Sequence, residues 1–581
     1  MRKTKIVCTL GPATDSVLRE LMLAGMDIAR INFSHGTHEQ HQERIDAVKK
    51  IREELDLPVA LLLDSKGPEV RIGTFENGGA TLKQDDIFTL SFKPCVGTQE
   101  HVYVDCEELK TALSIGDYMF IDDGNIKLRV KNISSKEIQC TVIDGGVVRD
   151  RKSVNVPGVP LHMKYISEND EKDIIFGIKN GFDYIAASFT RTANDVYEIK
   201  KFIDDNNGSH IHIIAKIENR EGIDNIDEII ELSDGIMVAR GDLGIEIPFE
   251  EIPKLQKILI KKAYSSGKKV ITATQMLESM IGSPRPTRAE TTDVANAIYD
   301  GTSSLMLSGE TAIGKYPLEA LRTMCKIAEY TENSIDYIKR FNRTTLENTN
   351  VADAISHATV TTAHDLGASA IITVTKTGTT ARMISKYRPA CPIITCTTDE
   401  CARRQLNMSW GVIPFMIEEC TNTDELFDNC INIALRENLV KNGDIVPITT
   451  GTPLGIPGTT NTLKVQIVGN ILVSGTGISK KIVSANVCAA ASEQELRDKF
   501  HDGDIVVISE TSNNIMDILR KCSGIITEKG GFSSHAAVVG LSLDIPVIFG
   551  AQFAADILKC GTTITMDSEG GHVYSGIIIN V

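Results

Sequence analysis

Short apolar runs alternate with helical patterns through roughly the first 330 residues of the chain. Each run is almost continuously apolar, which is typical of strands buried on both faces of a sheet. Stretches with helical spacing, such as DSVLRELMLAG and DEKDIIFGIKNG, lie between the runs. The runs are KIVCTL (5–10), DIARINFS (27–34), VALLLDS (59–65), YIAASFT (184–190), HIIAKIE (212–218), GIMVARG (235–241), KVITATQ (269–275) and SSLMLSG (303–309).

Eight such strand–helix units predict a (β/α)8 barrel, an α/β fold with all strands parallel. A doubly wound parallel sheet is the alternative fold with the same alternation. The third unit is interrupted, because between residues 70 and 165 the pattern changes to alternating strands and turns, as in GDYMFIDDGNIKLRVKNISSKEIQCTVIDGG. An all-β insertion after a barrel strand is expected to lie over the mouth of the barrel as a lid.

The remaining sequence predicts two more domains. Strand and helix patterns alternate again over residues 336–473, as in ASAIITVTKTG followed by TTARMISKYRP, which predicts a separate α/β domain. The polar segment SGTGISK (474–480) predicts a linker into a C-terminal extension. The expected domains are a barrel (1–69 and 166–335), a β lid (70–165), an α/β domain (336–473) and an extension (474–581).

Composition narrows the class of protein. The chain has 581 residues, 42% of them hydrophobic, and a net charge of −16, which argues against nonspecific nucleic-acid binding. It lacks an apolar run long enough to cross a bilayer, and MRKTKIVCTLGPATDS has no apolar core of a signal peptide. The 13 cysteines show no CxxC pairing, and the evenly spaced Cys391, Cys396 and Cys401 have no histidine-rich partner, so we expect reduced thiols in a cytoplasmic enzyme.

Polar side chains gather where the predicted strands end. The carboxyl ends of barrel strands converge on one mouth, where the active sites of this fold lie. Several strands contribute such groups, which favours an active site over surface decoration. The residues are Arg30, Asn32, Ser34, Asp64, Ser65, Lys66, Lys216, Glu218, Arg240, Asp242, Thr274, Ser308 and Glu310.

The chemistry of these residues indicates phosphoryl transfer with a metal ion. Glu218 and Asp242 offer the hard oxygen ligands that Mg²⁺ prefers. Lys216 lies two residues before Glu218, so both side chains leave the same face of the strand. Arg30 and Lys216 suit a transferring phosphoryl group. ARGDLG offers backbone N–H groups for a substrate carboxylate, and the hydroxyls of Thr274 and Ser308 suit proton transfer through water.

Other interpretations of the same residues remain open. Lys216 and Glu218 also suit a structural ion pair, Glu218 and Asp242 suit loop caps, and single hydroxyls at strand ends are commonly local caps. A lysine inside a barrel is also the nucleophile of Schiff-base enzymes. The neighbouring carboxylates favour metal-assisted chemistry over an imine.

Longer motifs in the same order resemble the pyruvate kinase family over residues 1 to about 473. The family transfers the phosphoryl group of phosphoenolpyruvate to ADP, giving pyruvate and ATP in glycolysis. The motifs are TKIVCTLGPAT, ARINFSHG, LLDSKGPEVRIG, AKIENREG, MVARGDLGIEIP, TATQMLESM, PRPTRAE and LSGETAIGKYPLEA.

The resemblance implies roles residue by residue. Glu218 and Asp242 would bind Mg²⁺ or Mn²⁺, whereas K⁺ would be held by Asn32, Ser34, Asp64 and the Ser65 carbonyl. Lys216 and Arg30 would contact the transferring phosphoryl group, with Gly241, Asp242 and Thr274 on the substrate. Arg71, His35 and Asn32 would lie on the nucleotide side. Ser308 resembles a member of the proton relay, although the resemblance leaves open which group protonates the enolate.

The resemblance also implies a homotetramer and a phosphorylated effector in the third domain, while charge and the lack of long apolar runs predict no nucleic-acid or membrane partner. TKTGTTAR (375–382) is a hydroxyl-rich loop that opens a helix, so its backbone N–H groups suit a phosphate. Ordinary helix capping is the alternative. The later loop TGTPLGIPGTTN lacks the arginine and tryptophan with which animal forms hold fructose 1,6-bisphosphate, so a sugar monophosphate or AMP is equally suitable. The expected effector residues are Thr375, Lys376, Thr377, Gly378, Thr379 and Thr380.

The extension carries a separate motif, GGFSSHAAVVG (530–540), in which glycines, serines and His535 open an apolar helix. ITEKGGFSSHAAVVGLSLDIPVIFG resembles the swivelling phosphohistidine domain of phosphoenolpyruvate synthase. Phe532 stands near the position where that domain carries an arginine, and the chain shows no ATP-binding domain to load the histidine. We therefore expect a stabilising or regulatory appendage. A phosphohistidine phosphotransferase, a phosphate sensor and a phosphoenolpyruvate-using lyase are the rival functions.

Overall fold

The computed structural model describes residues 1–161, 163–343, 350–420, 422–451, 460–469 and 471–576. Clustering of backbone contacts divides the chain into two compact units. One unit comprises Met1–Val360, Thr373–Glu419 and Thr450–Asn461, and the other comprises Thr361–Ile372, Cys420–Thr449 and Thr462–Val581.

Eight parallel strands of the first unit close into a barrel in the order β1-β16-β15-β14-β13-β12-β3-β2. This order confirms the predicted (β/α)8 fold and excludes the doubly wound sheet. Both faces of these strands are buried, which explains their continuous apolar runs. The strands are β1 (Lys5–Thr9), β2 (Ile28–Asn32), β3 (Ala60–Asp64), β12 (Tyr184–Ala187), β13 (His212–Ile217), β14 (Gly235–Ala239), β15 (Lys269–Ala273) and β16 (Ser304–Leu307).

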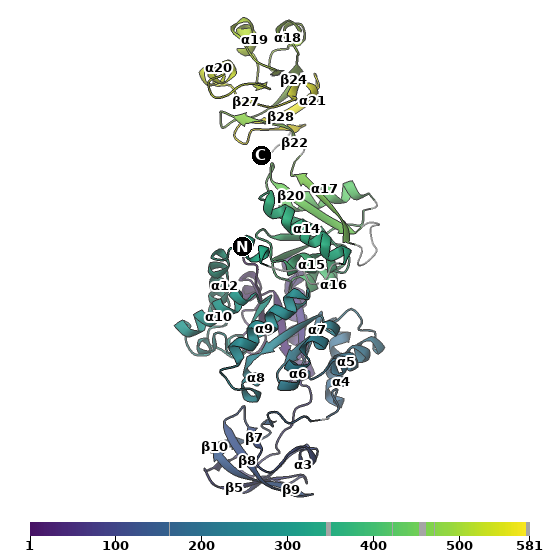
Figure 1. Ribbon diagram of the computed structural model, residues 1–581, viewed down its shortest axis with the longest axis vertical. Coiled ribbons are helices and arrows are strands. Elements are labelled where there is room, and N and C mark those ends of the chain that lie inside the picture. Colours follow the sequence, from purple (N-terminus) through teal and green to yellow (C-terminus); the bar gives the residue numbers. More distant parts are fainter. Residues whose placement is uncertain (162, 344–349, 421, 452–459, 470, 577–581) are drawn as a thin grey trace. The chain divides into compact units, whose positions relative to one another are not determined.

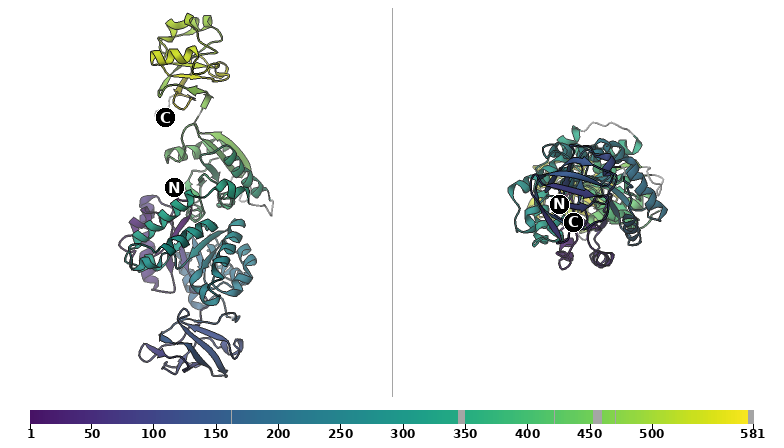
Figure 2. Two further views of the ribbon diagram at one scale, coloured as in Figure 1. Left: turned by 60° about the vertical axis from the view of Figure 1, so that its left-hand side comes forward. Right: turned by 90° about the horizontal axis from the view of Figure 1, so that it is seen from below.

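Helices surround the barrel strands (Figures 1 and 2). Their starts follow local sequence signals, as in α4, where the Ser167 side chain accepts from the Asp170 N–H in a capping box. The helices of this region are α1 (Leu18–Leu23), α2 (His38–Leu55), α4 (Glu168–Lys179), α5 (Ala193–Asp205), α6 (Arg220–Asp224), α7 (Ile226–Leu232), α8 (Arg240–Glu246), α9 (Ile252–Ser265), η1 (Glu278–Ile281), α10 (Arg288–Asp300), α11 (Gly309–Ala312), α12 (Pro317–Asn333) and α13 (Tyr337–Asn342).

The segment between β3 and α4 forms an all-β domain. A six-stranded sheet has the order β11-β7-β8-β9-β5-β6, and β10 pairs with β4. Buried and exposed positions alternate along β8 and β9, because one face of the sheet packs on a separate apolar core. The elements are β4 (Gly79–Leu82), β5 (Ile87–Ser91), β6 (His101–Tyr103), α3 (Leu109–Ala112), β7 (Tyr118–Ile121), β8 (Ile126–Ile133), β9 (Glu137–Asp144), β10 (Gly146–Arg149) and β11 (Val154–Asn155).

An α/β domain follows, with a five-stranded sheet in the order β19-β18-β17-β20-β21. The boundary between the two compact units falls within this domain. Residues 452–459, which make up most of the loop TGTPLGIPGTTN, lie outside the described residues. The elements are α14 (Val351–Asp365), β17 (Ile371–Val374), α15 (Thr379–Lys386), β18 (Ile393–Thr397), α16 (Glu400–Leu406), β19 (Val412–Met416), α17 (Thr423–Arg436), β20 (Ile445–Gly451) and β21 (Thr460–Ile467).

The C-terminal extension contains an eight-stranded sheet in the order β22-β29-β28-β24-β25-β26-β27-β23 (yellow in Figure 1). Its apolar residues form two clusters. The elements are β22 (Ile471–Ser474), β23 (Thr476–Gly477), β24 (Ile482–Ala489), α18 (Glu493–Lys499), β25 (Ile505–Ile508), η2 (Asn513–Ile515), α19 (Met516–Leu519), β26 (Gly524–Thr527), α20 (His535–Leu543), β27 (Val547–Phe549), α21 (Ala554–Ile557), β28 (Thr563–Asp567) and β29 (His572–Ser575).

The prediction of a linker over residues 474–480 is wrong. Ser474 pairs with His572, and Thr476 pairs with Phe549, both in antiparallel register. The segment is polar because both short strands lie at the edges of the sheet, where polar residues remain solvated. Among the described residues, no helix combines the length and apolar character needed to cross a bilayer.

Candidate active site

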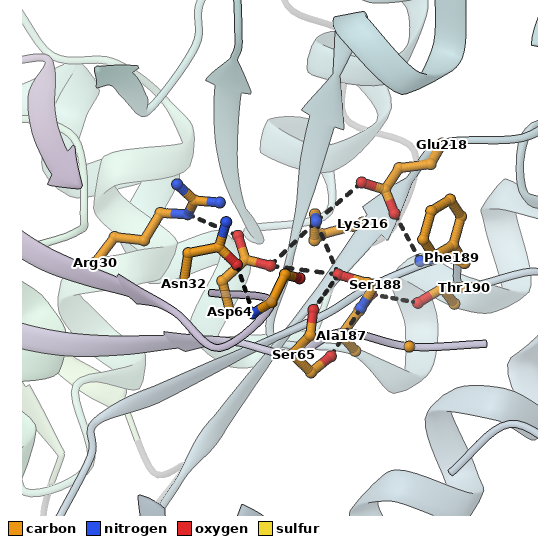
Figure 3. A network of polar contacts seen from close by, with 12 residues as sticks. Arg30, Asn32, Asp64, Ser65, Ala187, Ser188, Phe189, Thr190, Lys216 and Glu218 are labelled. Carbon is orange, nitrogen blue, oxygen red and sulfur yellow. Dashed lines mark hydrogen bonds and ion pairs between the residues drawn. The ribbon is translucent and has the colours of Figure 1, made fainter. Parts of the chain in front are cut away.

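Two basic side chains converge on one carboxylate at the carboxyl ends of β2, β3 and β13 (Figure 3). Arg30 donates from Nε to Asp64 Oδ2 at 2.7 Å, and Lys216 donates from Nζ to Asp64 Oδ1 at 3.0 Å. Arg30 Nη1 also donates to Thr9 Oγ1 at 2.7 Å. The barrel therefore brings together three of the predicted site residues from three separate strands.

Burial makes this charge cluster electrostatically strong. Asp64 is 1% exposed and Arg30 is 7% exposed. Burial alone would raise the pKa of Asp64, but the charges of Arg30 and Lys216 outweigh burial and lower it. Burial opposes the charge of Lys216, yet the carboxylates of Asp64, Glu218 and Asp242 raise its pKa above the ordinary value. Lys216 is therefore a cation throughout the neutral pH range.

Glu218 extends the cluster on the side away from Arg30. Its Oε1 lies 2.9 Å from Lys216 Nζ, so the two side chains share one face of the strand as predicted. Phe189 N–H donates to Glu218 Oε2 at 2.6 Å. Burial raises the pKa of Glu218, and the nearby Asp242 carboxylate raises it further. Glu218 Oε1 is buried, and its contact with Lys216 is an ion pair without hydrogen-bond geometry, which leaves a lone pair of this oxygen for a divalent cation.

Oxygen atoms also gather around the ends of β2 and β3. Asn32 Oδ1 accepts from Ser34 N–H at 3.0 Å, and the Ser65 carbonyl accepts from Ser188 Oγ at 2.6 Å. With Asp64, these are the donor types that a monovalent cation prefers. Within the described ranges, no group of three or more His, Cys, Asp and Glu side chains is arranged to hold a metal ion. A cation here would therefore also need carbonyl, hydroxyl or substrate oxygens.

Thr274 lies directly after β15 in a strained conformation. Its φ of 65° is in the left-handed region, where a β-branched residue is an outlier. Gly241 N–H donates to Thr274 Oγ1 at 2.7 Å, and Arg240 Nη2 donates to the Thr274 carbonyl at 2.8 Å. Arg240 is itself paired with Asp293 at 2.7 Å, so it acts as a brace for this loop. The hydrogen bonds to the side chain and to the carbonyl of Thr274 stabilise this strained backbone conformation.

Ser308 follows β16, and its backbone N–H donates to Glu310 Oε2 at 2.7 Å. Its hydroxyl is buried without a hydrogen-bond partner among the described residues. Glu310 also accepts from Leu277 N–H at 3.0 Å, so it is a structural anchor for two loops.

Two of the three residues expected on the nucleotide side, Arg71 and His35, lie apart from this network. Arg71 is paired with Glu69, with Nη2 2.6 Å from Oε2, and it donates to the Arg151 carbonyl at 2.7 Å. His35 is exposed and its N–H donates to the Asn32 carbonyl at 3.4 Å. Within the described part of the chain, no hydrogen bond or ion pair joins either side chain to Asp64 or Lys216.

Sequence reasoning missed Ser188, which lies directly after β12. Ser188 Oγ accepts from Lys216 Nζ at 2.8 Å and lies 3.3 Å from Asp64 Oδ1. Phe189, with φ of 54°, points its N–H at Glu218. The sequence feature that could have identified Ser188 is the segment SFT at the end of the fourth barrel strand. It contains no charged residue, so it did not stand out within the apolar run. Thr9 was missed for the same reason.

The predicted effector loop lies between β17 and α15. Gly378, with φ of 77°, is the N-cap of α15. The Thr377 and Thr379 hydroxyls are 3.1 Å apart, and Arg382 donates to the Thr377 carbonyl at 3.0 Å and to Thr379 Oγ1 at 3.1 Å. Thr380 differs, because its buried hydroxyl is 2.7 Å from Thr460 Oγ1.

His535 is the first residue of α20 in the extension, after the N-cap Ser534. Both ring nitrogens are engaged: Nδ1 is 2.9 Å from Thr511 Oγ1 and Nε2 is 3.0 Å from Asn513 Oδ1. Phe532 is 72% exposed and packs its ring edge against Phe549 at 5.2 Å. An exposed phenyl ring therefore occupies the place where the resemblance implies a cation.

Comparisons with known proteins cover the whole chain. Three family models match: "Pyruvate kinase, barrel domain" over residues 1–321, "Pyruvate kinase, alpha/beta domain" over residues 353–466, and "PEP-utilising enzyme, mobile domain" over residues 500–571.

Individual proteins are similar at high identity. A pyruvate kinase of Geobacillus stearothermophilus is 48% identical over 580 residues, and one of Bacillus licheniformis is 47% identical over 581 residues, each alignment covering 99% of both chains. The crystal structure of a pyruvate kinase from Cryptosporidium parvum matches with a TM-score of 0.77 and 39% identity, covering 80% of this chain and 96% of that chain.

Proposed function

The chain belongs to the pyruvate kinase family, and we infer that it transfers the phosphoryl group of phosphoenolpyruvate to ADP, giving pyruvate and ATP in glycolysis. The observation that carries the mechanism is the pair of buried cations, Arg30 and Lys216, that share Asp64 at the carboxyl ends of the barrel strands. A phosphoryl group leaving an enolate needs positive charge on both sides of the breaking bond.

We propose that Lys216 stabilises both the transferring phosphoryl group and the enolate oxygen, and that Arg30 contacts the same phosphoryl group. Asp64, Ser188 and Glu218 hold the Lys216 ammonium from three directions. Such preorganised charge costs little reorganisation during the reaction. Gly241, Asp242 and Thr274 would hold the substrate carboxylate end, supported by the strained loop at Thr274.

We propose that Glu218 and Asp242 bind Mg²⁺ or Mn²⁺, because these two neighbouring carboxylates supply hard oxygen ligands, and Glu218 Oε1 keeps a lone pair beside its ion pair with Lys216. When bound, the divalent ion supplies charge neutralisation to the phosphoryl and enolate oxygens. Asn32, Ser34, Asp64 and the Ser65 carbonyl would hold K⁺. Arg71, His35 and Asn32 would contact the nucleotide.

Proton delivery to the enolate needs hydroxyl groups near the reacting carbon. We propose Thr274 as the hydroxyl beside that carbon and Ser308 as part of a water-mediated relay. The free Ser308 hydroxyl supports this role, because a buried hydroxyl without a protein partner is available to a water molecule.

Several wider features of the family are proposed for this chain. They are a cytoplasmic homotetramer, an allosteric phosphorylated effector at Thr375–Thr380, and domain limits of 1–69 with 166–335, 70–165, 336–473 and 474–581, with the sheet of the extension reaching back to residue 471 through β22. For the extension we propose a stabilising or regulatory role. The engaged ring nitrogens of His535 and the exposed Phe532 argue against a phosphohistidine carrier.

The direct test is an assay of pyruvate formation from phosphoenolpyruvate with and without ADP. We expect pyruvate and ATP in equal amounts, and no pyruvate without ADP. A lyase would release pyruvate without ADP, and a phosphohistidine enzyme would leave acid-labile phosphate on His535 after incubation with labelled phosphoenolpyruvate. The first result would contradict the proposed reaction, and the second would contradict the accessory role of the extension.

A further inference from the structure

A small cleft with about 10 Å³ of free volume, open to solvent on one side, lies at the end of the barrel opposite the active site, between the start of β15 and helix α15. β15 begins at Lys269 beside this cleft and ends next to Thr274 at the other mouth. None of the residues assigned to the reaction lines the cleft.

Positive charge dominates the lining. Five cationic side chains contribute, and no aspartate or glutamate does: Lys268, Lys269, Arg382, Lys386 and Arg388. Lys386 is neutralised by Asp353, with which it shares two contacts of 3.1 Å. Within the described ranges, the other four have no ion pair at all. A cleft with this charge balance attracts anions.

Lys269 is one of two deeply buried cations in the cleft, with only 3% of its surface exposed. Its Nζ lies 3.3 Å from His212 Nδ1 and 5.1 Å from the ring centroid of Tyr184. Burial, together with the charge of Arg382, lowers the pKa of Lys269 to about 7. A buried ammonium in this state is stabilised by any anion that comes close.

Arg388 is the other buried cation, with 4% exposure. Its Nη2 donates to the Gly301 carbonyl at 2.9 Å and to Ser303 Oγ at 3.2 Å, and its guanidinium stacks 4.8 Å from the Trp410 ring centroid. Neutral acceptors and an aromatic face thus surround the charge, while Nε has no acceptor among the described residues. Burial lowers the pKa of Arg388 to about 9.

Ser409 provides an independent observation. It lines the cleft, is 3% exposed, and its hydroxyl has no hydrogen-bond partner in the part of the chain that the structure describes. Buried hydroxyls without partners are uncommon in folded proteins and need an explanation. A free donor beside two buried cations without carboxylate partners is the composition of an oxyanion site.

We propose that this cleft binds a phosphate-type oxyanion, either the free ion or the phosphate group of a small metabolite. The site is separate from the active site and from Thr375–Thr380. Lys269 and Arg388 supply the charge and Ser409 supplies a neutral donor. The free volume is close to that of one water molecule, so the lysine and arginine side chains move apart as the anion binds, and any further part of a metabolite projects through the open side of the cleft.

The anion would join the floor of the barrel to α15. Lys269 and Ser303 belong to the barrel, whereas Arg382 and Arg388 lie on or directly after α15. Arg382 reaches from the cleft to the Thr377 carbonyl and Thr379 Oγ1. An anion bound in the cleft would therefore hold α15, the helix that begins at the proposed effector loop, against the barrel.

Trp410 makes a direct test possible, because it lines the cleft and the chain contains one tryptophan. The experiment titrates the full-length protein with sodium phosphate at constant ionic strength, set with sodium chloride, and follows tryptophan fluorescence. We expect a saturable change. Parallel titrations with sodium sulfate and with a sugar monophosphate distinguish the sources: a sugar monophosphate that binds at least tenfold more tightly indicates a metabolite, and equal affinity indicates the free ion.

Variants locate the binding. Lys269→Met should raise the phosphate Kd at least about tenfold and Ser409→Ala about threefold, since each loses one contact to a charged ligand. Lys262→Met is the matched control, because this lysine on α9 is half-buried and paired with Asp227 outside the cleft. It should keep the wild-type Kd. A double variant, Thr377→Ala with Thr379→Ala, should retain the fluorescence change.

A thermal measurement provides a second readout that does not depend on fluorescence. Phosphate should raise the Tm of the wild type and of Lys262→Met more than that of Lys269→Met. Absence of a saturable fluorescence change in the wild type would overturn the proposal. Equal Kd values for Lys269→Met and Lys262→Met, with both variants folded, would also overturn it.

Discussion

At the scale of single residues, buried charge is used differently at the two ends of the barrel. Lys216 at the active-site mouth is surrounded by carboxylates, which raise its pKa. Lys269 at the opposite end forms no ion pair within the described residues, and burial is the main reason that its pKa falls to about 7. The first lysine is a permanent cation for catalysis, whereas the second gains or loses its charge near neutral pH.

This difference predicts the pH dependence of anion binding at the cleft. Sulfate keeps its charge between pH 6 and 8.5, so it reports on the protein alone. Because the lowered pKa of Lys269 lies near 7, the lysine is mostly charged at pH 6 and mostly neutral at pH 8.5. A bound anion favours the charged form, so sulfate affinity should fall as the pH rises, by about fivefold over this range.

The titratable and charged groups that face Lys269 are His212, Arg382, Lys268 and Asp234. Burial lowers the pKa of His212 well below its ordinary value. His212 is therefore neutral across the range. Fluorescence titration of Trp410 at each pH measures the effect, and Lys269→Met serves as the reference. A sulfate Kd that stays constant in the wild type would exclude Lys269 as the titrating group.

Glu69 allows a prediction about K⁺. In relatives that do not need potassium, the resemblance places a lysine at this position, whose ammonium replaces the charge of the ion. Glu69 instead pairs with Arg71 at 2.6 Å. We therefore expect activity to depend on K⁺, and Glu69→Lys to reduce that dependence. The dependence is measured as the ratio of initial rates with and without K⁺ in tetramethylammonium buffer. Full wild-type activity without K⁺ would contradict the prediction.

The sequence predicted most of the charged site residues, because charged side chains at strand ends are conspicuous within apolar runs. Arg30, Lys216 and Glu218 were identified in this way. Ser188 and Thr9 were missed, since hydroxyls at strand ends are common and only the structure shows that they contact Lys216 and Arg30. The anion cleft was missed because its residues come from separate segments between Lys268 and Trp410.

At the scale of elements, continuous apolar runs predicted the barrel strands well, since burial on both faces leaves a strong pattern. The short strands β22 and β23 were missed, because Thr476–Gly477 has too few residues to show a period. The pairing partners of such strands lie far away in the sequence. Their assignment therefore depends on tertiary contacts that local sequence does not carry.

Helix α15 and the loop before it carry a prediction about regulation. Thr377 and Thr379 are at the helix start with hydroxyls facing each other, whereas Thr380 is buried against Thr460. The double variant Thr377→Ala with Thr379→Ala should abolish activation by a phosphorylated metabolite and leave the basal rate unchanged. Steady-state kinetics with a panel of sugar phosphates and AMP measure the apparent KM for phosphoenolpyruvate.

The matched control is Thr380→Ser, which keeps the buried hydroxyl and should retain activation. Lowering of KM by the effector to the same extent in the double variant and the wild type would show that the loop is an ordinary helix start.

At the scale of the whole molecule, the extension is predicted to be dispensable for chemistry. It has its own sheet and apolar clusters. Removal of residues 471–581 takes away β22 together with its partner β29, so no unpaired strand remains. The truncated protein should still form pyruvate, with altered Tm or effector response. His535→Ala in the full chain should change kcat by less than about twofold.

A kcat decrease of more than tenfold in His535→Ala, with an unchanged Tm, would contradict an accessory role. For the truncated protein and for His535→Ala, kcat is measured by titration with phosphoenolpyruvate, and the wild type measured in the same way is the reference.

The central claim is that the Lys216 ammonium, held by Asp64, Ser188 and Glu218, stabilises the charge that develops during phosphoryl transfer. The most direct test is the kcat of Lys216→Met at saturating phosphoenolpyruvate, ADP, Mg²⁺ and K⁺, beside the exposed-lysine control Lys200→Met. Removing the cation should cost about 3 kcal/mol or more of transition-state stabilisation, so kcat should fall at least about 100-fold while Lys200→Met retains the wild-type rate. A folded Lys216→Met enzyme with kcat within tenfold of the wild type would contradict the account.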